Sequence, residues 1–406
     1  MKHRRISWRA CVLLPSPGRL SMGLFCKVSI TLFAIVLTTS VAKGIDPGNL
    51  VFPNYGLNAL QVFNTASREV VQTIPVPPPY SIQGSIMLLT VLVRGSDHNI
   101  FVNVRDGSGN PAVLVLTEQG QFVAAQDATP DAGWFLQQIA FDPLDASEST
   151  VIGGVPFLPE IRAINPFTHS VTTRVSTASA NFIGIATDSQ GNIYAGDYNT
   201  QRIFIYHVTG VYTGVYIDVE GTAGYGTNGM AGDGEGNTYI AGDDRIAKYD
   251  SANNLVGVFT NASFNQPNSV FFNPNDGLLY VSNQGDGNVI IMTTSGSEVD
   301  VVSLGGMDAG VPGLVPTPKV QIANLQNTVQ ALVSAGTLQA GAGRYLLAPL
   351  NAALTELNTG QTSFAIRELR GFISRVRVLE IFWGLKPAEG QTLINTAKSL
   401  IAELRG

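Results

Sequence analysis

The sequence predicts an all-β six-bladed β-propeller followed by a small all-α four-helix bundle, and three observations lead to this prediction. First, a unit of 41 to 50 residues recurs between residues 46 and 304. Second, only 13% of the 406 residues are charged, against about 25% in an average domain, and the chain contains 43 Gly and 21 Pro. Third, the apolar residues take a helical spacing after residue 318. Many short strands are therefore expected first, and helices only at the end.

Residues 1–42 have the features of a signal peptide. Six Lys or Arg residues precede the apolar run VSITLFAIVL, residues 28–37, and the small residues Ser40-Val41-Ala42 follow it as a cleavage site. The run is too short for a permanent membrane span. Met22 is a possible true start, because the segment from Met22 to Ala42 has the usual length of a signal peptide. Cleavage predicts a secreted or periplasmic protein, and a retained N-terminal anchor is the alternative.

Cleavage would change the charge and the cysteine content of the chain. The first 42 residues hold six of the 24 basic residues and no acidic residue, which leaves 18 basic against 30 acidic residues and a net charge of −12. This balance argues against nucleic acid or an anionic membrane as a partner, because both attract a basic face. Cys11 and Cys26 both lie in this segment. The mature chain is therefore expected to have no disulfide, no thiolate nucleophile and no cysteine-bound zinc, as in many bacterial envelope proteins.

The repeat is clearest around Tyr194. The stretch DSQGNIYAGD, residues 188–197, returns as DGEGNTYIAGD at 233–243 and, with less similarity, as NPNDGLLYVSN at 273–283. The equivalent position in the six units is occupied by Val51, Phe101, Val151, Tyr194, Tyr239 and Tyr280. Four short strands per unit, joined by Gly/Asn/Asp turns, are typical of a propeller blade. The first unit lacks an innermost strand, so the way in which the ring closes is left open.

The blade from Ile183 to Tyr206 resembles the NHL family of propellers. It follows that family's pattern G-I-A-x-D-x-x-G-N-I-Y-x-x-D and then R-I. The resemblance implies a six-bladed propeller. It implies no function, because this fold hosts binding proteins, scaffolds, lactonases and lyases alike.

The last hundred residues contain a linker and two helical hairpins. Residues 305–318 are rich in Gly and Pro and are expected to be a linker, and residues 319–406 are expected to form the bundle. The two hairpins are copies offset by 47 residues, so that Gly343 corresponds to Gly390. Pro349 is expected to kink the second helix or to mark a late start.

This region resembles the FIMAH-type helical domain. The residues that carry the resemblance are Phe372-Ile373, the stretch Val329 to Leu332, and Pro387 to Gly390. The resemblance implies a role in attachment or in contact with a partner. A bundle that only packs against the propeller is the alternative.

Motifs for catalysis are absent from the sequence. There is no G-x-S-x-G, no H-E-x-x-H and no phosphate-binding loop, and His98, His169 and His207 occur singly. A likeness to streptogramin lyases is also disfavoured, because these need a catalytic histidine. The stretches 106–110 and 188–192 have the composition of calcium loops but lack the closing Glu. Since the second of them recurs in several units, we expect turns that the Asp side chains cap.

The channel of the propeller offers the remaining candidate site. Gln137, Asn228 and Asn268 lie just before first strands and are expected to point toward the channel mouth. The surrounding residues resemble the gluconolactonase/regucalcin-like family, which implies Asn228 and Asn268 as ligands of one divalent cation. The family's Asp is Asn268 here and its Glu element is missing, so a carboxylate would have to come from Asp97, Asp131 or Asp233.

Two functions are compatible with these observations. The first is a binding or scaffold protein that recognises a protein or a glycan through a loop face, where aromatic residues such as Tyr198, Tyr225 and Phe264 could stack on a ligand. The alternative is a metal-dependent lactonase or hydrolase that uses the channel. The lack of catalytic motifs favours the first, with no cofactor other than a possible divalent cation.

Overall fold

The computed structural model describes residues 44–405 except 83–87, 129–135, 156–157, 223–227, 307–308 and 383–384. All described residues belong to one compact unit, Gly44–Gly406. The predicted signal peptide, with Met22, its cleavage site and both cysteines, lies outside the described residues.

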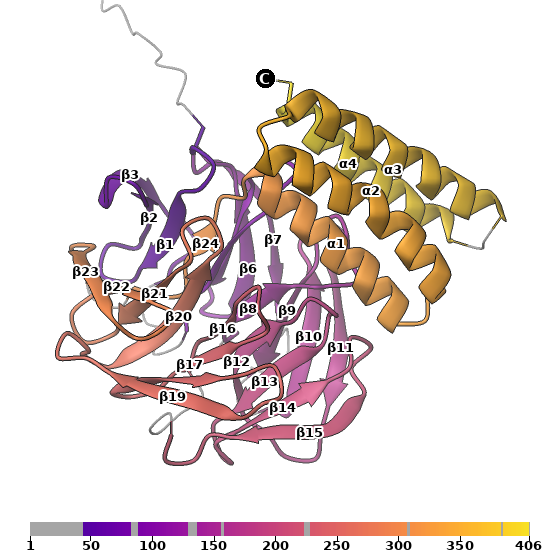
Figure 1. Ribbon diagram of the computed structural model, residues 1–406. Coiled ribbons are helices and arrows are strands. Elements are labelled where there is room, and N and C mark those ends of the chain that lie inside the picture. The colour runs from indigo at the N-terminus through magenta and orange to yellow at the C-terminus, as the bar shows by residue number, and fades with distance from the viewer. Residues whose placement is uncertain are drawn as a thin grey trace, which may run out of the picture. The chain divides into compact units, whose positions relative to one another are not determined.

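The β part consists of six sheets of four antiparallel strands each (Figure 1). The first sheet contains β1 (Leu50–Asn54), β2 (Ala59–Asn64), β3 (Glu69–Pro75) and β24 (Gly313–Leu314). The second contains β4 (Val91–Val93), β5 (Ile100–Arg105), β6 (Pro111–Leu116) and β7 (Phe122–Asp127). The third contains β8 (Ile139–Phe141), β9 (Val151–Val155), β10 (Glu160–Asn165) and β11 (Ser170–Ser176).

The remaining sheets follow the same order. The fourth contains β12 (Phe182–Thr187), β13 (Ile193–Asp197), β14 (Arg202–Tyr206) and β15 (Tyr212–Asp218). The fifth contains β16 (Met230–Gly232), β17 (Thr238–Ala241), β18 (Arg245–Tyr249) and β19 (Leu255–Thr260). The sixth contains β20 (Pro267–Asn273), β21 (Leu278–Asn283), β22 (Asn288–Thr293) and β23 (Glu298–Ser303). The six-bladed β-propeller is therefore confirmed.

The predicted repeat positions fall on the same strand of every blade. Val51, Phe101, Val151, Tyr194, Tyr239 and Tyr280 lie on β1, β5, β9, β13, β17 and β21, each the second strand from the inner edge of its sheet. Neighbouring blades share apolar clusters; for example, Phe182 of the fourth blade packs with Ile152 and Ile161 of the third. A single blade cannot bury both of its faces, so this packing between blades forms most of the core.

The ring closes through β24, within the stretch expected to be a linker. Gly313 pairs with Val51, and Leu314 pairs with Leu50, so a segment from the end of the propeller supplies the innermost strand of the first blade. A Cβ on Gly313 would lie 2.8 Å from the Val91 carbonyl oxygen, so glycine permits the close approach of the second blade. The propeller thus extends to Leu314 and not only to residue 304. Two residues in a Gly/Pro-rich stretch are too short to show the alternation of a strand.

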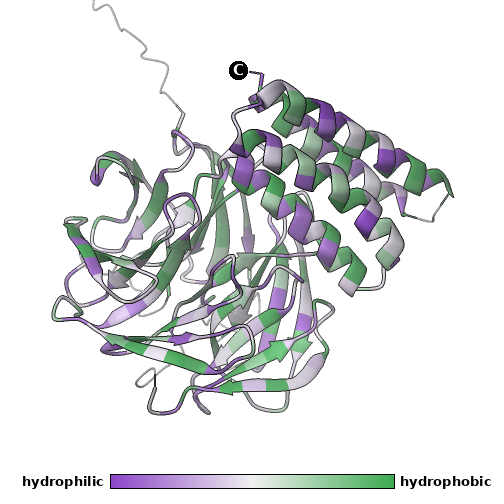
Figure 2. Ribbon diagram, viewed as in Figure 1, coloured by the Kyte–Doolittle hydropathy of each residue, from purple (hydrophilic) through white to green (hydrophobic). Residues whose placement is uncertain are grey.

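The four helices of the bundle follow at once. They are α1 (Pro318–Ser334), α2 (Ala340–Asn358), α3 (Thr362–Phe382) and α4 (Pro387–Glu403). Their apolar sides, green in Figure 2, meet in one core that includes Val329, Leu332 and Phe372, which the FIMAH resemblance singles out. Pro349 is buried inside α2, which begins at Ala340, so a late start of this helix is wrong.

The duplicated glycines mark the places where paired helices approach closely. A Cβ on Gly343 of α2 would lie 2.3 Å from Cγ2 of Val333 on α1. A Cβ on Gly390 of α4 would likewise lie 2.1 Å from Oε1 of Glu380 on α3. The same contact recurs in both hairpins, which gives the internal repeat a physical reason.

The bundle contacts the propeller through α1 and α4. The Ser399 hydroxyl donates to the Ser96 carbonyl oxygen at 2.7 Å, and the Thr396 hydroxyl donates to the Ala146 carbonyl oxygen at 2.9 Å. Leu144, together with Ala146, packs against the core of the bundle. Among the described residues, no helix has the length and apolar character that crossing a membrane requires.

Candidate functional site

The propeller has two ends that carry different loops. The strand-start end holds the beginnings of the innermost strands and the loops between second and third strands, such as 55–58, 106–110 and 198–201. The turn end holds the turns between first and second strands, such as 94–99, 142–150 and 188–192. The bundle contacts residues 95–96 and 146–148, so it lies on the turn end.

Two buried amides tie the innermost strands together in the channel. Gln138, on the third blade, accepts hydrogen bonds from the N–H groups of Ile185 and Met230, both at 3.2 Å, and donates to the Met230 carbonyl oxygen at 3.1 Å. It thereby links the third blade to the fourth and fifth. Asn103 donates to the carbonyl oxygens of Leu88 and Leu136 at 3.0 and 2.9 Å. Neither role could be predicted from the sequence, because neither residue belongs to the repeated motif.

The three predicted channel residues lie at the strand-start end but in different environments. Gln137 is only 1% exposed, and its side-chain oxygen accepts a hydrogen bond from the Leu88 N–H at 3.2 Å. Asn268 is 7% exposed, and its backbone carbonyl accepts from the Gly229 N–H at 2.8 Å. Asn228, the residue before Gly229, is half-buried. Asn228 and Asn268 therefore belong to adjacent strand starts, whereas Gln137 serves the contact between the second and third blades.

The carboxylates that a divalent cation would need are held elsewhere. Asp97 lies in a turn at the other end of the propeller, where Arg94 Nη2 donates to its Oδ2 at 2.6 Å. Asp233 also lies at the turn end and accepts from the backbone N–H and the side-chain amide of Asn237, at 2.9 and 2.8 Å. Asp131 lies outside the described residues. No group of three or more His, Cys, Asp or Glu residues that could hold a metal occurs among the residues that the structure describes.

The available donors thus do not fit a catalytic divalent cation. Neutral amides alone are poor ligands for a hard cation, which prefers carboxylates. The described residues around Asn228 and Asn268 therefore support no hydrolytic step that passes through a metal. Their polar groups suit hydrogen bonds to a ligand or to the strand ends.

The turns that resemble calcium loops use their own carboxylates. Asp188 Oδ1 accepts from the N–H groups of Gln190 and Asn192 at 2.9 and 2.8 Å, and its Oδ2 accepts from the Asn192 amide at 2.8 Å. Asp106 and Asp233 make the equivalent bonds in their turns. Burial alone would raise the pKa of Asp233, but the hydrogen bonds from Asn237 and Glu235 outweigh it and lower the pKa. The predicted capping of turns is confirmed.

Exposed apolar side chains are present on the loops of the strand-start end. Tyr198, between β13 and β14, is 48% exposed, and Leu57, between β1 and β2, is 47% exposed. Phe264 packs instead against the apolar cluster of the fifth and sixth blades. Tyr225 lies outside the described residues. Of the three aromatic candidates, Tyr198 is therefore the one that the structure shows accessible to a ligand.

A half-buried carboxylate joins the bundle to the turn end. Glu148, between β8 and β9, accepts from the Gly95 N–H at 2.6 Å and from the Asn324 side-chain amide of α1 at 3.0 Å. Burial raises the pKa of Glu148, although these hydrogen bonds oppose the effect. The sequence could not reveal this contact, because the two residues lie 176 positions apart.

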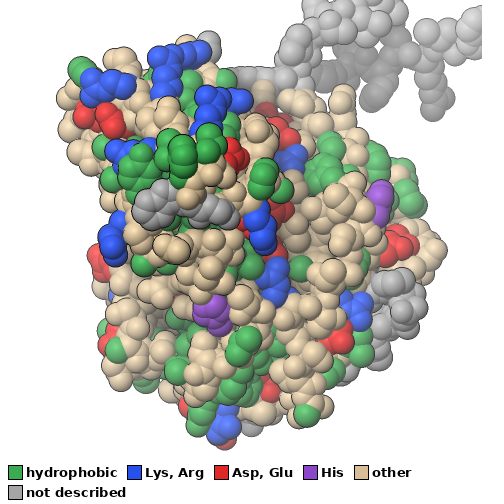
Figure 3. Space-filling view, turned by 90° about the vertical axis from the view of Figure 1, so that its right-hand side faces the viewer, with side chains coloured by type: hydrophobic (Ala, Val, Ile, Leu, Met, Phe, Trp, Pro, Cys, Tyr) green, Lys and Arg blue, Asp and Glu red, His purple; other side chains and the backbone are tan. Residues whose placement is uncertain are grey.

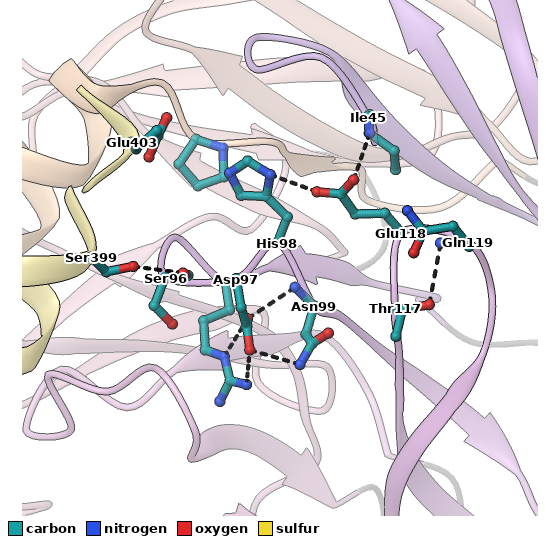
Figure 4. Close-up of polar contacts among 12 residues, drawn as sticks. Ile45, Ser96, Asp97, His98, Asn99, Thr117, Glu118, Gln119, Ser399 and Glu403 are labelled. Atoms are coloured by element: carbon teal, nitrogen blue, oxygen red, sulfur yellow. Dashed lines mark hydrogen bonds and ion pairs between the residues drawn. The ribbon is translucent and has the colours of Figure 1, made fainter. Parts of the chain in front are cut away.

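A second carboxylate at this end holds the start of the folded chain (Figure 4). The Ile45 N–H donates to Glu118 Oε2 at 2.7 Å, and His98 Nδ1 lies 2.6 Å from Glu118 Oε1. The side chains of His98 and Glu118 are only 18% and 14% exposed. Of the other described histidines, His169 contacts Gln126 of the neighbouring blade, and His207 contacts Thr209 within its own turn. His98 thus fixes the N-terminal segment through Glu118 and lies at the end opposite to the channel mouth.

Comparisons with known proteins identify the fold only. No protein-family model matches the chain. No curated protein matches it either. Among solved structures, a chain of a nidogen/laminin complex is similar with a TM-score of 0.51 and 15% identity, over 66% of this chain and 99% of that chain. At this identity the likeness concerns the propeller and not its ligand.

Two further solved structures show weaker likeness. A protein of unknown function from Bacteroides caccae has a TM-score of 0.47 and 16% identity, over 63% of this chain and 94% of that chain. A virginiamycin B lyase from Staphylococcus aureus has a TM-score of 0.41 and 14% identity, over 54% of this chain and 70% of that chain.

Proposed function

We propose that this protein is an exported β-propeller that binds a protein or a glycan through the loops of its strand-start end, with the helical bundle as an attachment or interaction module. The observation that carries the proposal is the position of the bundle. Hydrogen bonds from Ser399 and Thr396 hold it on the turn end, so the opposite end keeps its loops available. Ligands of a propeller commonly meet the loops at one end of the ring, where several blades contribute side chains.

The chemistry of the strand-start end suits recognition better than catalysis. Asn228 supplies a partly exposed amide, and Tyr198 supplies an exposed aromatic ring. Amides donate and accept hydrogen bonds with sugar hydroxyls or peptide groups, and a tyrosine ring stacks on a sugar face or on an apolar side chain. Among the described residues, no group of three or more His, Cys, Asp or Glu could hold a metal ion there. The described residues therefore supply the polar and aromatic groups that a binding role requires.

A glycan array, together with pull-downs from bacterial envelope extracts, tests the proposal. The probe is residues 44–406, and the variants are Tyr198→Ala and Asn228→Ala. We expect the wild type to retain a ligand and each variant to lose about tenfold or more in affinity. The matched control is Tyr212→Ala, which removes a similarly exposed tyrosine from the outer strand β15. No ligand in either screen, or equal losses in the control, would contradict the proposal.

The lactonase alternative is tested on the same preparations. Protein purified without a chelator is analysed for metal, and the wild type and Asn228→Ala are assayed on lactones. Stoichiometric metal together with a lactonase activity that Asn228→Ala abolishes would replace the binding proposal with the hydrolase.

A further inference from the structure

The charge of the chain is divided unevenly between its two domains. Residues 44–318 hold eight basic and 25 acidic residues, a net charge of −17, whereas residues 319–406 hold nine basic and five acidic residues, a net charge of +4. The bundle is therefore basic although the net charge of the whole chain is negative. The negative net charge disfavours an anionic partner surface for the propeller but not for this domain.

One side of α3 combines exposed apolar and basic side chains. Phe364, Val378, Ile381 and Phe382 are 43%, 38%, 72% and 75% exposed. They recur at helical spacing, so they share one side of the helix. Exposed arginines lie on and beside the same side. We name this set the α3 stripe: Phe364, Arg367, Arg370, Arg377, Val378, Ile381 and Phe382.

The stripe lies away from the contact with the propeller. The hydrogen bonds that join the domains come from α1 and α4, whereas α3 lies on the outer part of the bundle (Figure 1). In the view of Figure 3, Lys and Arg side chains gather at the upper left, where the bundle lies, with hydrophobic side chains beside them. A broad partner can therefore reach the stripe without displacing the propeller.

Local contacts hold arginine and aromatic groups side by side at this surface. The Arg367 guanidinium lies 4.7 Å from the centre of the Phe364 ring. Arg375 lies 4.6 Å from the ring centre of Tyr345 on α2 and donates to the Tyr345 carbonyl oxygen at 2.6 Å. Glu368 is the acidic neighbour and pairs with Arg367 at 3.3 Å. Arg370 and Arg377 are exposed, so their charges face the solvent.

We propose that the α3 stripe docks on the surface of an anionic lipid bilayer. The arginines match the phosphate groups of anionic lipids, to which each basic side chain near the surface contributes about 1 kcal/mol, or about fivefold in affinity. Ile381 and Phe382 enter the boundary between headgroups and acyl chains, as apolar side chains of interfacial helices do. The helix lies along the surface and does not span the bilayer.

Two other partners explain less of the stripe. A nucleic acid would pair with the arginines but would leave Ile381 and Phe382 in water. A second copy of the chain also offers acidic groups. Because its surface is curved, these groups would have to lie directly opposite Arg370 and Arg377 for the two copies to pair. The bilayer accounts for the basic and the apolar side chains together.

Vesicle sedimentation tests the proposal with residues 44–406, which exclude the apolar N-terminal segment and form one compact unit. We expect binding to vesicles with about 30% phosphatidylglycerol, weak binding to pure phosphatidylcholine, and release by salt that screens the charges. The double variant Arg370→Gln/Arg377→Gln should lose about 25-fold in affinity. The double variant Ile381→Ser/Phe382→Ser should lose about tenfold or more at unchanged charge.

Two matched controls separate the stripe from general surface effects. Arg245→Gln removes a half-buried arginine from β18, and Val256→Ser removes a side chain that is 57% exposed on β19. Both should bind vesicles as the wild type does. Circular dichroism melts of all variants check that the bundle is folded.

Three results would overturn the proposal. The first is no binding of folded wild type to anionic vesicles at low salt. The second is binding that the Ile381→Ser/Phe382→Ser variant retains in full, especially if duplex DNA competes, because the arginines alone would then act as a polyanion site. The third is a wild-type dimer in light scattering that these two substitutions convert to a monomer, which would assign the stripe to a second copy.

Discussion

Asn324 on α1 and Glu148 in the propeller join the two domains through one hydrogen bond, 3.0 Å from Nδ2 to Oε1. The other carboxylate oxygen accepts from the Gly95 N–H at 2.6 Å, so a single side chain connects the second blade, the third blade and the bundle. Burial raises the pKa of this carboxyl group. The contact between the domains should therefore respond to pH.

The variant Glu148→Gln should reduce the pH dependence of stability. Because the folded pKa is raised, the unfolded chain releases this proton first as the pH rises, and the free energy of unfolding falls from about pH 4.5 upward through the folded pKa. Above that pKa this contribution stays constant. Melting temperatures at pH 4.5 and pH 8 should differ less in Glu148→Gln than in the wild type. The control Glu235→Gln, in an exposed turn, should keep the wild-type difference, and a profile of Glu148→Gln equal to the wild type would contradict the assignment.

The variant Asn324→Ala should weaken the contact between the domains. It leaves an oxygen of the half-buried Glu148 carboxylate without its amide donor, which costs about 1–3 kcal/mol. Chemical denaturation measures the loss, and hydrogen exchange should increase in α1 and in residues 145–150. Gln326→Ala is the control, since Gln326 bonds Asn351 at the exposed surface of the same bundle. Equal losses in both variants would show that Asn324 has no special role.

Truncation tests the closure of the ring. A chain of residues 44–317 retains β24, whose Gly313 and Leu314 pair with β1, and should unfold in one cooperative transition. A chain of residues 44–304 lacks β24 and exposes the edge of β1, so it should be far less stable or should aggregate. Differential scanning calorimetry distinguishes the two. Equal melting temperatures would show that the ring does not depend on β24.

The variant Gln138→Ala should destabilise the centre of the propeller. It removes the acceptor for the N–H groups of Ile185 and Met230 in two other blades, and each unsatisfied buried group costs about 1–3 kcal/mol. We expect a total loss of about 2–5 kcal/mol in urea denaturation. Gln190→Ala, on an exposed turn, should change stability by less than about 0.5 kcal/mol. A loss for Gln138→Ala as small as that would disprove the bridging role.

The variant Asp188→Ala should act on stability and not on calcium binding. Asp188 accepts three hydrogen bonds within its own turn, and the loss of such a cap costs about 0.5–2 kcal/mol. Added calcium should leave the melting temperature of the wild type and of the variant unchanged. A rise with calcium in the wild type alone would restore the metal interpretation of this turn.

The sequence predicted the parts of the fold that repeat. Tyr194, Tyr239 and Tyr280 occupy one strand position because each blade must bury the same face, and that requirement leaves a period in the sequence. The closure by Gly313 and Leu314 occurs once and is two residues long, so it leaves no period. Helix boundaries followed from apolar spacing, but the approach of α1 to Glu148 depends on residues that are remote in the chain.

The candidate site was harder to predict for a related reason. Asn228 and Asn268 lie at adjacent strand starts, a position that follows from the blade repeat. Gln137 and Gln138 are neighbours in the chain, and spacing alone could not tell which amide bonds the second blade and which bonds the fourth and fifth. The α3 stripe depends on which helices face the propeller, and apolar periodicity does not report this.

The junction between β24 and α1 has a mechanical consequence. Leu314 ends the closing strand, and Pro318 begins the first helix, so only a short connection separates the ring from the bundle. If the bundle is held on a surface while a ligand pulls on the propeller, tension passes first through the hydrogen bonds of Ser399 and Thr396. Once these hydrogen bonds break, the force acts directly on the pairs Gly313–Val51 and Leu314–Leu50, which close the ring. The same short segment that completes the propeller would then be the point where a sustained pull opens it.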